Sequence, residues 1–139
     1  MNVVYDCHIP EVMGYAERGY CFRRGEDALL MWEGYFSDLM HAMWTLYGWE
    51  PDLDEPSAPN LGQVPLLREW NEEGWMGTDG PLLITGLGAT ANAFREAVAE
   101  LRRAGLNLAE SPQHGEALAG FLEQAVATGQ AVSVEEWWG

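Results

Sequence analysis

Residues 26–47 read EDALLMWEGYFSDLMHAMWTLY, and this stretch decides the fold that the sequence predicts. Apolar side chains occupy most sides of a helical projection, and a single narrow polar ridge runs along it at i+4 spacing. The members of the ridge are Glu33, Ser37, His41 and Thr45. Acidic residues in the first turn suit the positive end of a helix dipole, and Gly48 suits a C-terminal cap. The pattern predicts one long helix over residues 26–47.

A helix with so little polar surface is buried on most sides. One interpretation makes it the central helix of the fold, with side chains such as Phe36 and Leu39 in the core. The other lets part of its methionine and aromatic face meet a partner. We expect the core interpretation, and the second stays open at this point.

The flanking sequence predicts short strands and two further helices. Toward the N-terminus, residues 3–8 alternate in polarity and residues 19–23 form a β-prone run between glycines, so we expect two strands that pair with each other. The remaining predicted elements are a buried strand at 82–85, a helix over 89–104 stopped by Gly105, a helix over 111–128 with Ser111 as cap, Pro112 in first position and Gly129 at its end, and an edge strand within 130–138.

Together these elements predict a single α+β domain over residues 1–139, with a small, mainly antiparallel sheet packed by about three helices. A hydrophobic fraction of 47% is too high for intrinsic disorder. Residues 50–79 lack a sustained period and predict a long loop, with room for a short helix around residues 66–73. Loops of this length in compact domains are usually functional or mobile.

The chain is strongly acidic, with 22 Asp and Glu against 7 Lys and Arg and a net charge of −15. Residues 50–79 hold 8 of the acids and 1 Arg, so nearly half of the surplus lies in that loop. Tryptophans flank and interrupt the acidic run, and aromatic side chains are frequent anchors of protein interfaces. We therefore expect a basic protein partner. The predicted partner-binding residues are Trp49, Asp52, Asp54, Glu55, Trp70, Glu72, Glu73 and Trp75.

Other binding classes are disfavoured. Nucleic-acid binding needs clustered cations, and the close pairs Arg23-Arg24 and Arg102-Arg103 are offset by nearby acids. No apolar run approaches the roughly 18 residues of a membrane span. The first residues lack the pattern of a signal peptide, so a cytoplasmic location is expected. Cys7 and Cys21 then predict free buried thiols.

One short motif is typical of proteins that bind a dinucleotide cofactor. Residues 86–91, GLGATA, match the dinucleotide-binding pattern G-x-G-x-x-A between a predicted strand and a predicted helix. In such a motif an acidic residue follows further along the chain, and Glu110 is in the place to fill that role. Only 29 residues follow Glu110, which is too few for the further strand and helix units of a doubly wound fold. The other interpretation is a structural turn. We expect no cofactor and no metal, since only Cys7-His8 and Asp38 with His41 bring possible ligands close together. No catalytic motif occurs, so we expect a protein that is not an enzyme.

The closing stretch, from Phe121-Leu122 through Thr128-Gly129-Gln130 to Val134-Glu135-Glu136-Trp137, resembles the helix, turn and tryptophan-bearing strand that end one family of deaminase-associated immunity proteins. More generally, a small, acidic, tryptophan-rich chain resembles the immunity proteins that bacteria pair with polymorphic or secreted toxins. The resemblance implies a stoichiometric inhibitor of a cognate toxin domain. Two alternatives are a phage-encoded anionic mimic that blocks a host nucleic-acid-binding complex and a small ligand-binding or catalytic domain using the Gly86 turn.

Overall fold

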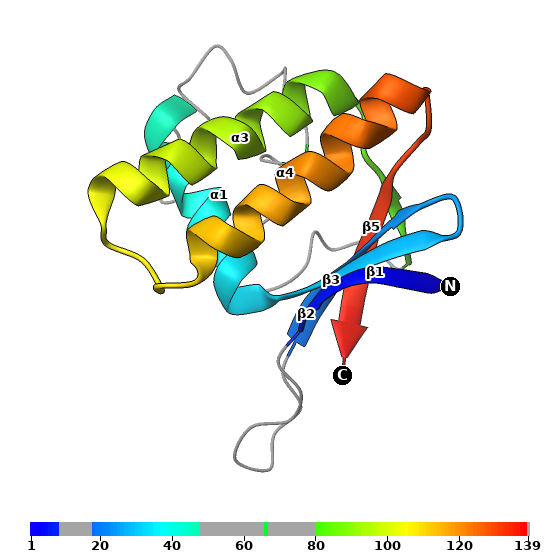
Figure 1. Ribbon diagram of the computed structural model, residues 1–139, viewed down its shortest axis with the longest axis horizontal. Helices are drawn as coiled ribbons and strands as arrows, with labels where there is room; N and C mark the ends of the chain where they lie inside the picture. The colour runs from blue at the N-terminus through cyan, green and yellow to red at the C-terminus, as the bar shows by residue number, and fades with distance from the viewer. Residues whose placement is uncertain (9–17, 48–65, 67–79, 139) are drawn as a thin grey trace.

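The computed structural model describes residues 1–8, 18–47, 66 and 80–138, which form five strands and three helices (Figure 1). The strands are β1 (Asn2–Cys7), β2 (Arg18–Arg24), β3 (Asp27–Trp32), β4 (Leu82–Leu83) and β5 (Ser133–Trp138). The helices are α1 (Glu33–Tyr47), α3 (Leu87–Ala104) and α4 (Ser111–Thr128).

The strands form one sheet in the order β1-β3-β2-β5-β4. Among the described strands, only β1 and β3 run parallel to each other, and the other three pairings are antiparallel. The predicted α+β class with a mainly antiparallel sheet and three helices is confirmed. The predicted pairing of the two N-terminal strands is wrong, because β3 lies between β1 and β2.

The long helix predicted over residues 26–47 is wrong in its first part, where Asp27–Trp32 is strand β3. Gly25 has a φ of 57°, a left-handed conformation that suits glycine and closes a tight hairpin between β2 and β3. Both faces of β3 are buried, from Ala28 to Met31, so the strand shows no alternation of polarity. A short apolar run of this kind cannot be told from a buried helix by its period.

The remaining part of that helix, α1, lies in the core as expected. Phe36, Leu39, Met40 and Met43 are fully buried. His41 and Thr45 on the predicted polar ridge are exposed. The periodicity therefore predicted the orientation of α1 correctly, although it placed the start of the helix too early.

Both later helices match their predictions closely. α3 begins two residues before the predicted start and ends before Gly105, and α4 covers the predicted residues and ends before Gly129. The predicted cap is wrong: Glu110 precedes the helix and Ser111 is its first residue. The Ser111 hydroxyl instead donates a hydrogen bond to Asp38 of α1, at 2.5 Å.

The interior and edge positions predicted for the last two strands are reversed in the structure. β5 is not an edge strand, because it lies between β2 and β4. The predicted buried strand at residues 82–85 is the edge instead, only two residues long, with Leu83 58% exposed and Ile84 buried. Length explains the error, since a short apolar run suits an interior strand and a two-residue edge equally well.

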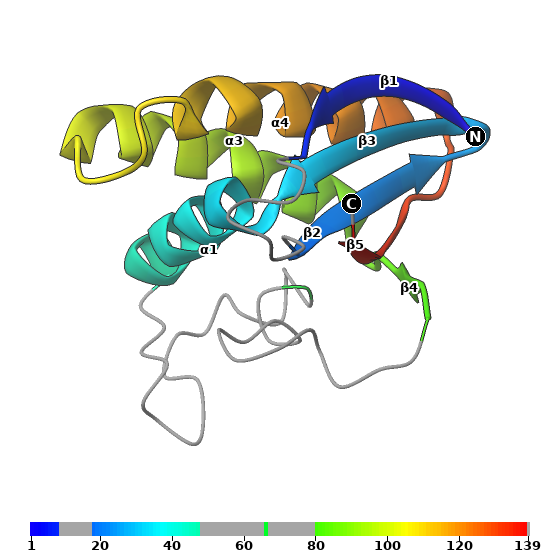
Figure 2. The ribbon, with the colours of Figure 1, turned by 90° about the horizontal axis from the view of Figure 1, so that it is seen from below.

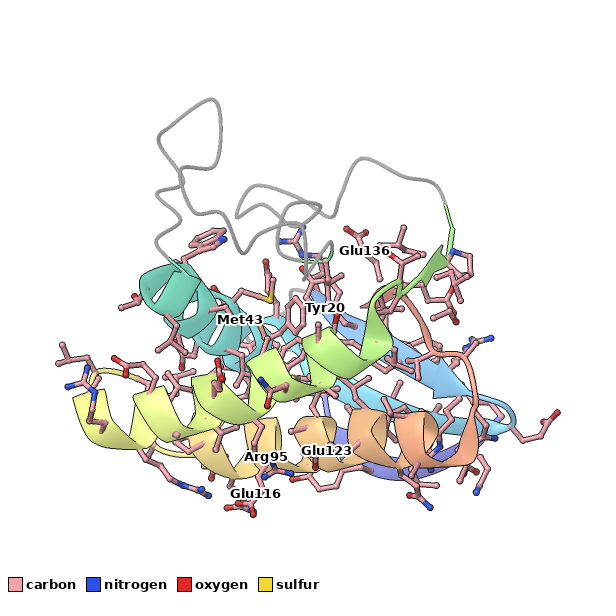
Figure 3. The ribbon with its side chains drawn as sticks, turned by 90° about the horizontal axis from the view of Figure 1, so that it is seen from above. Tyr20, Met43, Arg95, Glu116, Glu123 and Glu136 are labelled. Atoms are coloured by element: carbon pink, nitrogen blue, oxygen red, sulfur yellow. The ribbon has the colours of Figure 1, made fainter. Side chains whose placement is uncertain are left out.

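The three helices cover one face of the sheet, and the main core lies between them (Figure 2). Tyr20 and Met43 point into this core from β2 and α1 (Figure 3). Leu66 is also buried there. On the opposite face of the sheet, Cys21 belongs to a small separate cluster, whereas Cys7 lies in the main core. Both cysteines are free and buried, as predicted.

Within the described ranges, no helix has the length and apolar character needed to cross a bilayer.

The Gly86 turn gives a stability prediction with a built-in control. Gly86 precedes α3 with φ 61° and ψ 44°, where a side chain costs about 1 to 2 kcal/mol. We expect Gly86→Val to lower the free energy of unfolding by at least that amount. Gly88 lies in the first turn of α3, and an added Cβ would meet nothing within 4 Å. Gly88→Ala should therefore raise stability by about 1 kcal/mol. Urea unfolding of both variants measures the difference, and equal losses would contradict the assignment.

Candidate partner-binding surface

The partner-binding residues predicted from the sequence lie outside the described residues. This applies to Trp49, Asp52, Asp54, Glu55, Trp70, Glu72, Glu73 and Trp75. Their role stays a prediction. Trp44, which precedes them in the chain, is described and is 4% exposed, packed within the core beside His41. Trp44 therefore contributes to stability rather than to an exposed surface.

The described arginines are all engaged with carboxylates. The pairs are Arg18 with Glu33 and Glu136, Arg23 with Glu135, Arg24 with Asp27, Arg95 with Glu123 and Glu116, Arg102 with Glu116, and Arg103 with Glu100. Figure 3 shows Arg95 of α3 beside Glu116 and Glu123 of α4. Each pair neutralises a cation that could otherwise contact a phosphate group.

The charge that remains is negative. The described residues hold 12 Asp and Glu against 6 Arg, so they account for 6 of the 15 surplus negative charges. The other 9 belong to residues outside the described ranges. In the part of the chain that the structure describes, cations are paired and carboxylates are in excess, which favours a cationic partner.

One exposed segment stands out, the α3–α4 loop, which comprises residues 105–110. Leu106 is 92% exposed and Leu108 is 44% exposed. The sequence analysis missed both leucines. The sequence did hold a signal for their exposure. Both leucines lie between the glycine that ends one predicted helix and the start of the next, outside the periodic apolar pattern of either helix.

Hydrogen bonds from both sides hold this loop in place. The Asp38 carboxylate of α1 accepts hydrogen bonds from the Leu108 amide, at 3.0 Å, and from the Ser111 hydroxyl. The Asn107 side chain donates to the Leu101 carbonyl at 2.7 Å. The loop is therefore tied to α1 and to the end of α3, and it presents its leucines from a fixed backbone.

A cluster of polar aromatic groups supports the same loop at its end. The Tyr35 hydroxyl donates to the Glu110 carboxylate at 2.8 Å, and the His114 ring lies between Glu110, at 3.6 Å, and the Tyr5 hydroxyl, at 2.7 Å. The hydrogen bond from Tyr35, followed by that from His114, lowers the pKa of Glu110. These hydrogen bonds therefore favour the anionic form of Glu110. Burial, and then the hydrogen bond to Glu110, raise the pKa of Tyr35 to about 12.

This cluster predicts how stability depends on alkaline pH. The Tyr35 pKa is raised, so its stabilising contribution is complete below the ordinary value of 10.0 and is lost as pH rises toward about 12. We expect unfolding free energy to fall over that interval, and Tyr35→Phe to make the fall shallower. Urea titrations of both proteins at a series of alkaline pH values measure it. Identical slopes would show that Tyr35 does not contribute.

Two shallow hollows flank the α3–α4 loop. One, of about 290 Å³, is lined by Asp38, His41, Ala42, Thr45, Glu100, Leu101, Ala104 and Leu106. The other, of about 240 Å³, is lined by Trp32, Tyr35, Leu108, Ala109 and Glu110. Each hollow thus has one loop leucine and at least one carboxylate in its lining. The two hollows therefore combine apolar and carboxylate groups in their linings.

The other sequence-based site hypotheses fare differently. β4 is a two-residue antiparallel edge strand, whereas the dinucleotide fingerprint needs a parallel strand before its glycine turn. This position of β4 favours the structural interpretation of the Gly86 turn, in which the Thr90 hydroxyl donates to the Gly86 carbonyl at 3.0 Å. Among the described residues, no group of three His, Cys, Asp or Glu side chains is placed to hold a metal ion.

Comparison of the chain with known protein families, curated proteins and solved structures finds no match. The functional argument therefore rests on the residues and their geometry.

Proposed function

We propose that this protein is a stoichiometric inhibitor that binds and neutralises a basic protein domain, in the manner of a bacterial immunity protein and its cognate toxin. Inhibition comes from occupying the partner's surface and not from catalysis. Electrostatic attraction brings the partner to the anionic surface, and burial of apolar anchors then holds it.

The observation that carries the proposal is that the arginines are paired while carboxylates remain in excess. All six described arginines are paired with carboxylates, and the surplus is negative both within the described residues and in the acidic segment 50–79. A surface of this kind repels phosphate groups and attracts Lys-rich or Arg-rich surfaces. The stretch that carries the sequence resemblance to immunity proteins forms α4, the turn at Gly129 and β5.

A second candidate, the phage-encoded anionic mimic, shares this charge argument and differs in its partner. It would bind a host nucleic-acid-binding complex, whereas an immunity protein binds a toxin whose gene lies beside its own. The third alternative, a ligand-binding or catalytic domain using the Gly86 turn, loses support from the antiparallel edge position of β4. A clear rise in melting temperature with millimolar NAD or ATP would restore it.

The test is a titration against the product of the adjacent upstream gene, purified as its catalytic domain. We expect binding with one-to-one stoichiometry, loss of the domain's activity at equimolar inhibitor, and weaker binding as salt rises. Full activity of that domain in the presence of excess inhibitor would reject the immunity function. Binding to a host nucleic-acid-binding complex in its place would support the phage mimic.

The acidic segment supplies a further prediction for the same assay. Replacing Asp52, Asp54 and Glu55 with their amides should mainly slow association and flatten its dependence on salt, because exposed rim charges act through steering. Trp70→Ala or Trp75→Ala should chiefly speed dissociation, at a cost of about 2 kcal/mol or more for a hot spot. Stopped-flow kinetics separates the two effects. A large loss of thermal stability in both Trp variants would instead assign those residues to the fold.

A further inference from the structure

We infer that the hollow between the β3–α1 junction and the α3–α4 loop binds a quaternary ammonium head group, such as that of choline. This hollow, of about 240 Å³, is lined by Trp32, Tyr35, Leu108, Ala109 and Glu110. Pockets for drug-sized ligands have volumes of about 300 Å³ or more, so this one suits a small head group. The inference goes beyond the proposed function and does not depend on it.

Two aromatic rings form a corner of the hollow. Trp32 is the last residue of β3, and Tyr35 lies in the first turn of α1. Their ring centroids are 5.2 Å apart and the ring planes meet at 88°. In a perpendicular pair the faces of both rings border the same corner, and each face carries the negative part of the ring's quadrupole. A cation in this corner is therefore attracted by both rings, and most strongly by tryptophan.

The position of the Trp32 ring depends on Gly34. A Cβ on Gly34 would overlap the six-membered ring of Trp32, so the indole lies directly over this glycine. The missing side chain thus lets the indole lie beside the start of α1, next to Tyr35. Because the ring is in place before a ligand arrives, less conformational entropy is lost on binding.

Glu110 supplies a negative charge that is not paired with an arginine of the described residues. Its contacts with the Tyr35 hydroxyl and the His114 ring are both made through Oε2. A tyrosine hydroxyl and a neutral imidazole leave the charge of a carboxylate in place. At the end of α3, Arg102 and Arg103 pair with other carboxylates and do not line this hollow. The hollow therefore combines ring faces with one uncompensated carboxylate.

The kind of cation follows from the lining. A primary ammonium has three N–H donors and is strongly hydrated. Apart from Glu110, the lining side chains are the two aromatic rings, Leu108 and Ala109, and the Tyr35 hydroxyl already donates to Glu110. A quaternary ammonium has no N–H group, so it leaves no donor unsatisfied against apolar walls. The lining therefore fits a methylated nitrogen better than the side chain of lysine.

The experiment titrates the full-length protein with three compounds at constant ionic strength. They are choline, its neutral carbon analogue, in which a tert-butyl group replaces the trimethylammonium group, and butylammonium. The indole N–H signal of Trp32 in NMR spectra, assigned with Trp32→Phe, reports binding. We expect a saturable shift with choline, a Kd in roughly the millimolar range, and binding at least about tenfold tighter than that of either other compound.

A charge variant tests the role of Glu110. Glu110→Gln keeps an acceptor for the Tyr35 hydroxyl but removes the charge, so choline should bind about tenfold more weakly. Glu123→Gln is the matched control, because it removes the same charge from α4 at a carboxylate that pairs with Arg95 and does not line the hollow. It should bind choline like the wild type.

A glycine variant tests the position of the Trp32 ring. Gly34→Ala displaces the ring while every lining side chain is kept, so choline binding should weaken by at least about fivefold. Gly88→Ala is the control, because a Cβ there meets nothing within 4 Å. Melting curves establish that each variant is folded, and if Gly34→Ala does not fold, Glu110→Gln decides.

Four results would overturn the inference. The first is the absence of a saturable shift with choline. The second is equal binding of choline and its neutral analogue, which would leave an apolar hollow without a preference for charge. The third is tighter binding of butylammonium, which would assign the hollow to a lysine side chain. The fourth is unchanged choline binding by Glu110→Gln, which would place the site elsewhere on the protein.

Discussion

Replacing Phe36 with alanine is expected to lower the free energy of unfolding by about 3 to 5 kcal/mol. Phe36 is fully buried in α1, and its ring packs against Tyr20 and Phe22 of β2, at centroid distances of 4.5 and 5.8 Å, and against Phe94 of α3, at 6.1 Å. One side chain therefore connects the sheet to two helices. Its loss leaves a cavity that none of these elements can fill alone.

Domains of this size are stable by only about 5 to 15 kcal/mol, so the Phe36→Ala variant should approach the unfolding threshold. Urea unfolding followed by tryptophan fluorescence measures the loss. Leu106→Ala serves as the control, because truncating an exposed leucine should change stability by no more than about 0.5 kcal/mol. A loss below about 1 kcal/mol for Phe36→Ala would mean that α1 is not central to the core.

The second large effect concerns Gly115, at the place where α4 approaches α1 and α3. A Cβ on Gly115 would lie 2.5 Å from a Leu39 methyl carbon and 2.9 Å from a Val98 methyl carbon. Leu39 and Val98 are both buried, so neither has free space to move into. We expect Gly115→Val to lower unfolding free energy by about 3 kcal/mol through overpacking.

Gly120 in the same helix is the matched control. A Cβ there would meet nothing within 4 Å, so Gly120→Ala should raise stability by about 1 kcal/mol through helix propensity. Thermal and urea unfolding of the two glycine variants should therefore differ in sign. A loss at both positions would show that helix packing at Gly115 is not the cause.

A double-mutant cycle tests the contact itself. Leu39→Ala alone should cost about 2 to 5 kcal/mol, because it opens a cavity beside Gly115. Gly115→Ala places its methyl group where the Leu39 side chain had been, so the pair should lose less stability than the two single variants together. We expect a coupling of about 1 kcal/mol or more. Strict additivity would contradict the contact.

The sequence predicted the elements whose signal is local. α3 and α4 were placed almost correctly because both carry a regular apolar face and end before a glycine in the left-handed region, Gly105 and Gly129. The orientation of α1 followed from its polar ridge for the same reason. Free buried thiols at Cys7 and Cys21 also followed from their small number and context.

The failures at β3, in strand order and at Ser111 depend on partners that are distant in sequence. Strand β3 is buried on both faces by other parts of the chain, so its own pattern could not separate it from the helix that follows directly at Glu33. Strand order cannot be read from local periodicity. The sequence therefore did not show that β3 would lie between β1 and β2, which were expected to pair with each other. Ser111 was expected to cap its own helix, but Asp38, 73 positions earlier, captures its hydroxyl.

In the candidate site too, the sequence predicts what is local and misses what depends on contacts between distant segments. Charge is additive along a sequence, so the excess of carboxylates could be counted without a structure. The α3–α4 loop could not be recognised in this way, because the exposure of Leu106 and the supporting contacts of Asp38 and Tyr35 exist only once three separate segments meet. The predicted acidic segment at 50–79 thus remains a hypothesis about how the partner is held, independent of the loop.

The place of β5 has a consequence for how the protein is made. β5 pairs with β2 on one side and β4 on the other, and Arg18 at the start of β2 lies opposite Trp138. A ribosome that has released β1, β2, β3 and all three helices still holds a sheet without the strand that links β2 to β4. The pairings of β5 with β2 and with β4 must therefore wait until β5 has left the exit tunnel, whereas β1, β3 and β2 can pair before then. Until then the nascent chain exposes an unpaired edge at β2, where a chaperone or another nascent chain could bind.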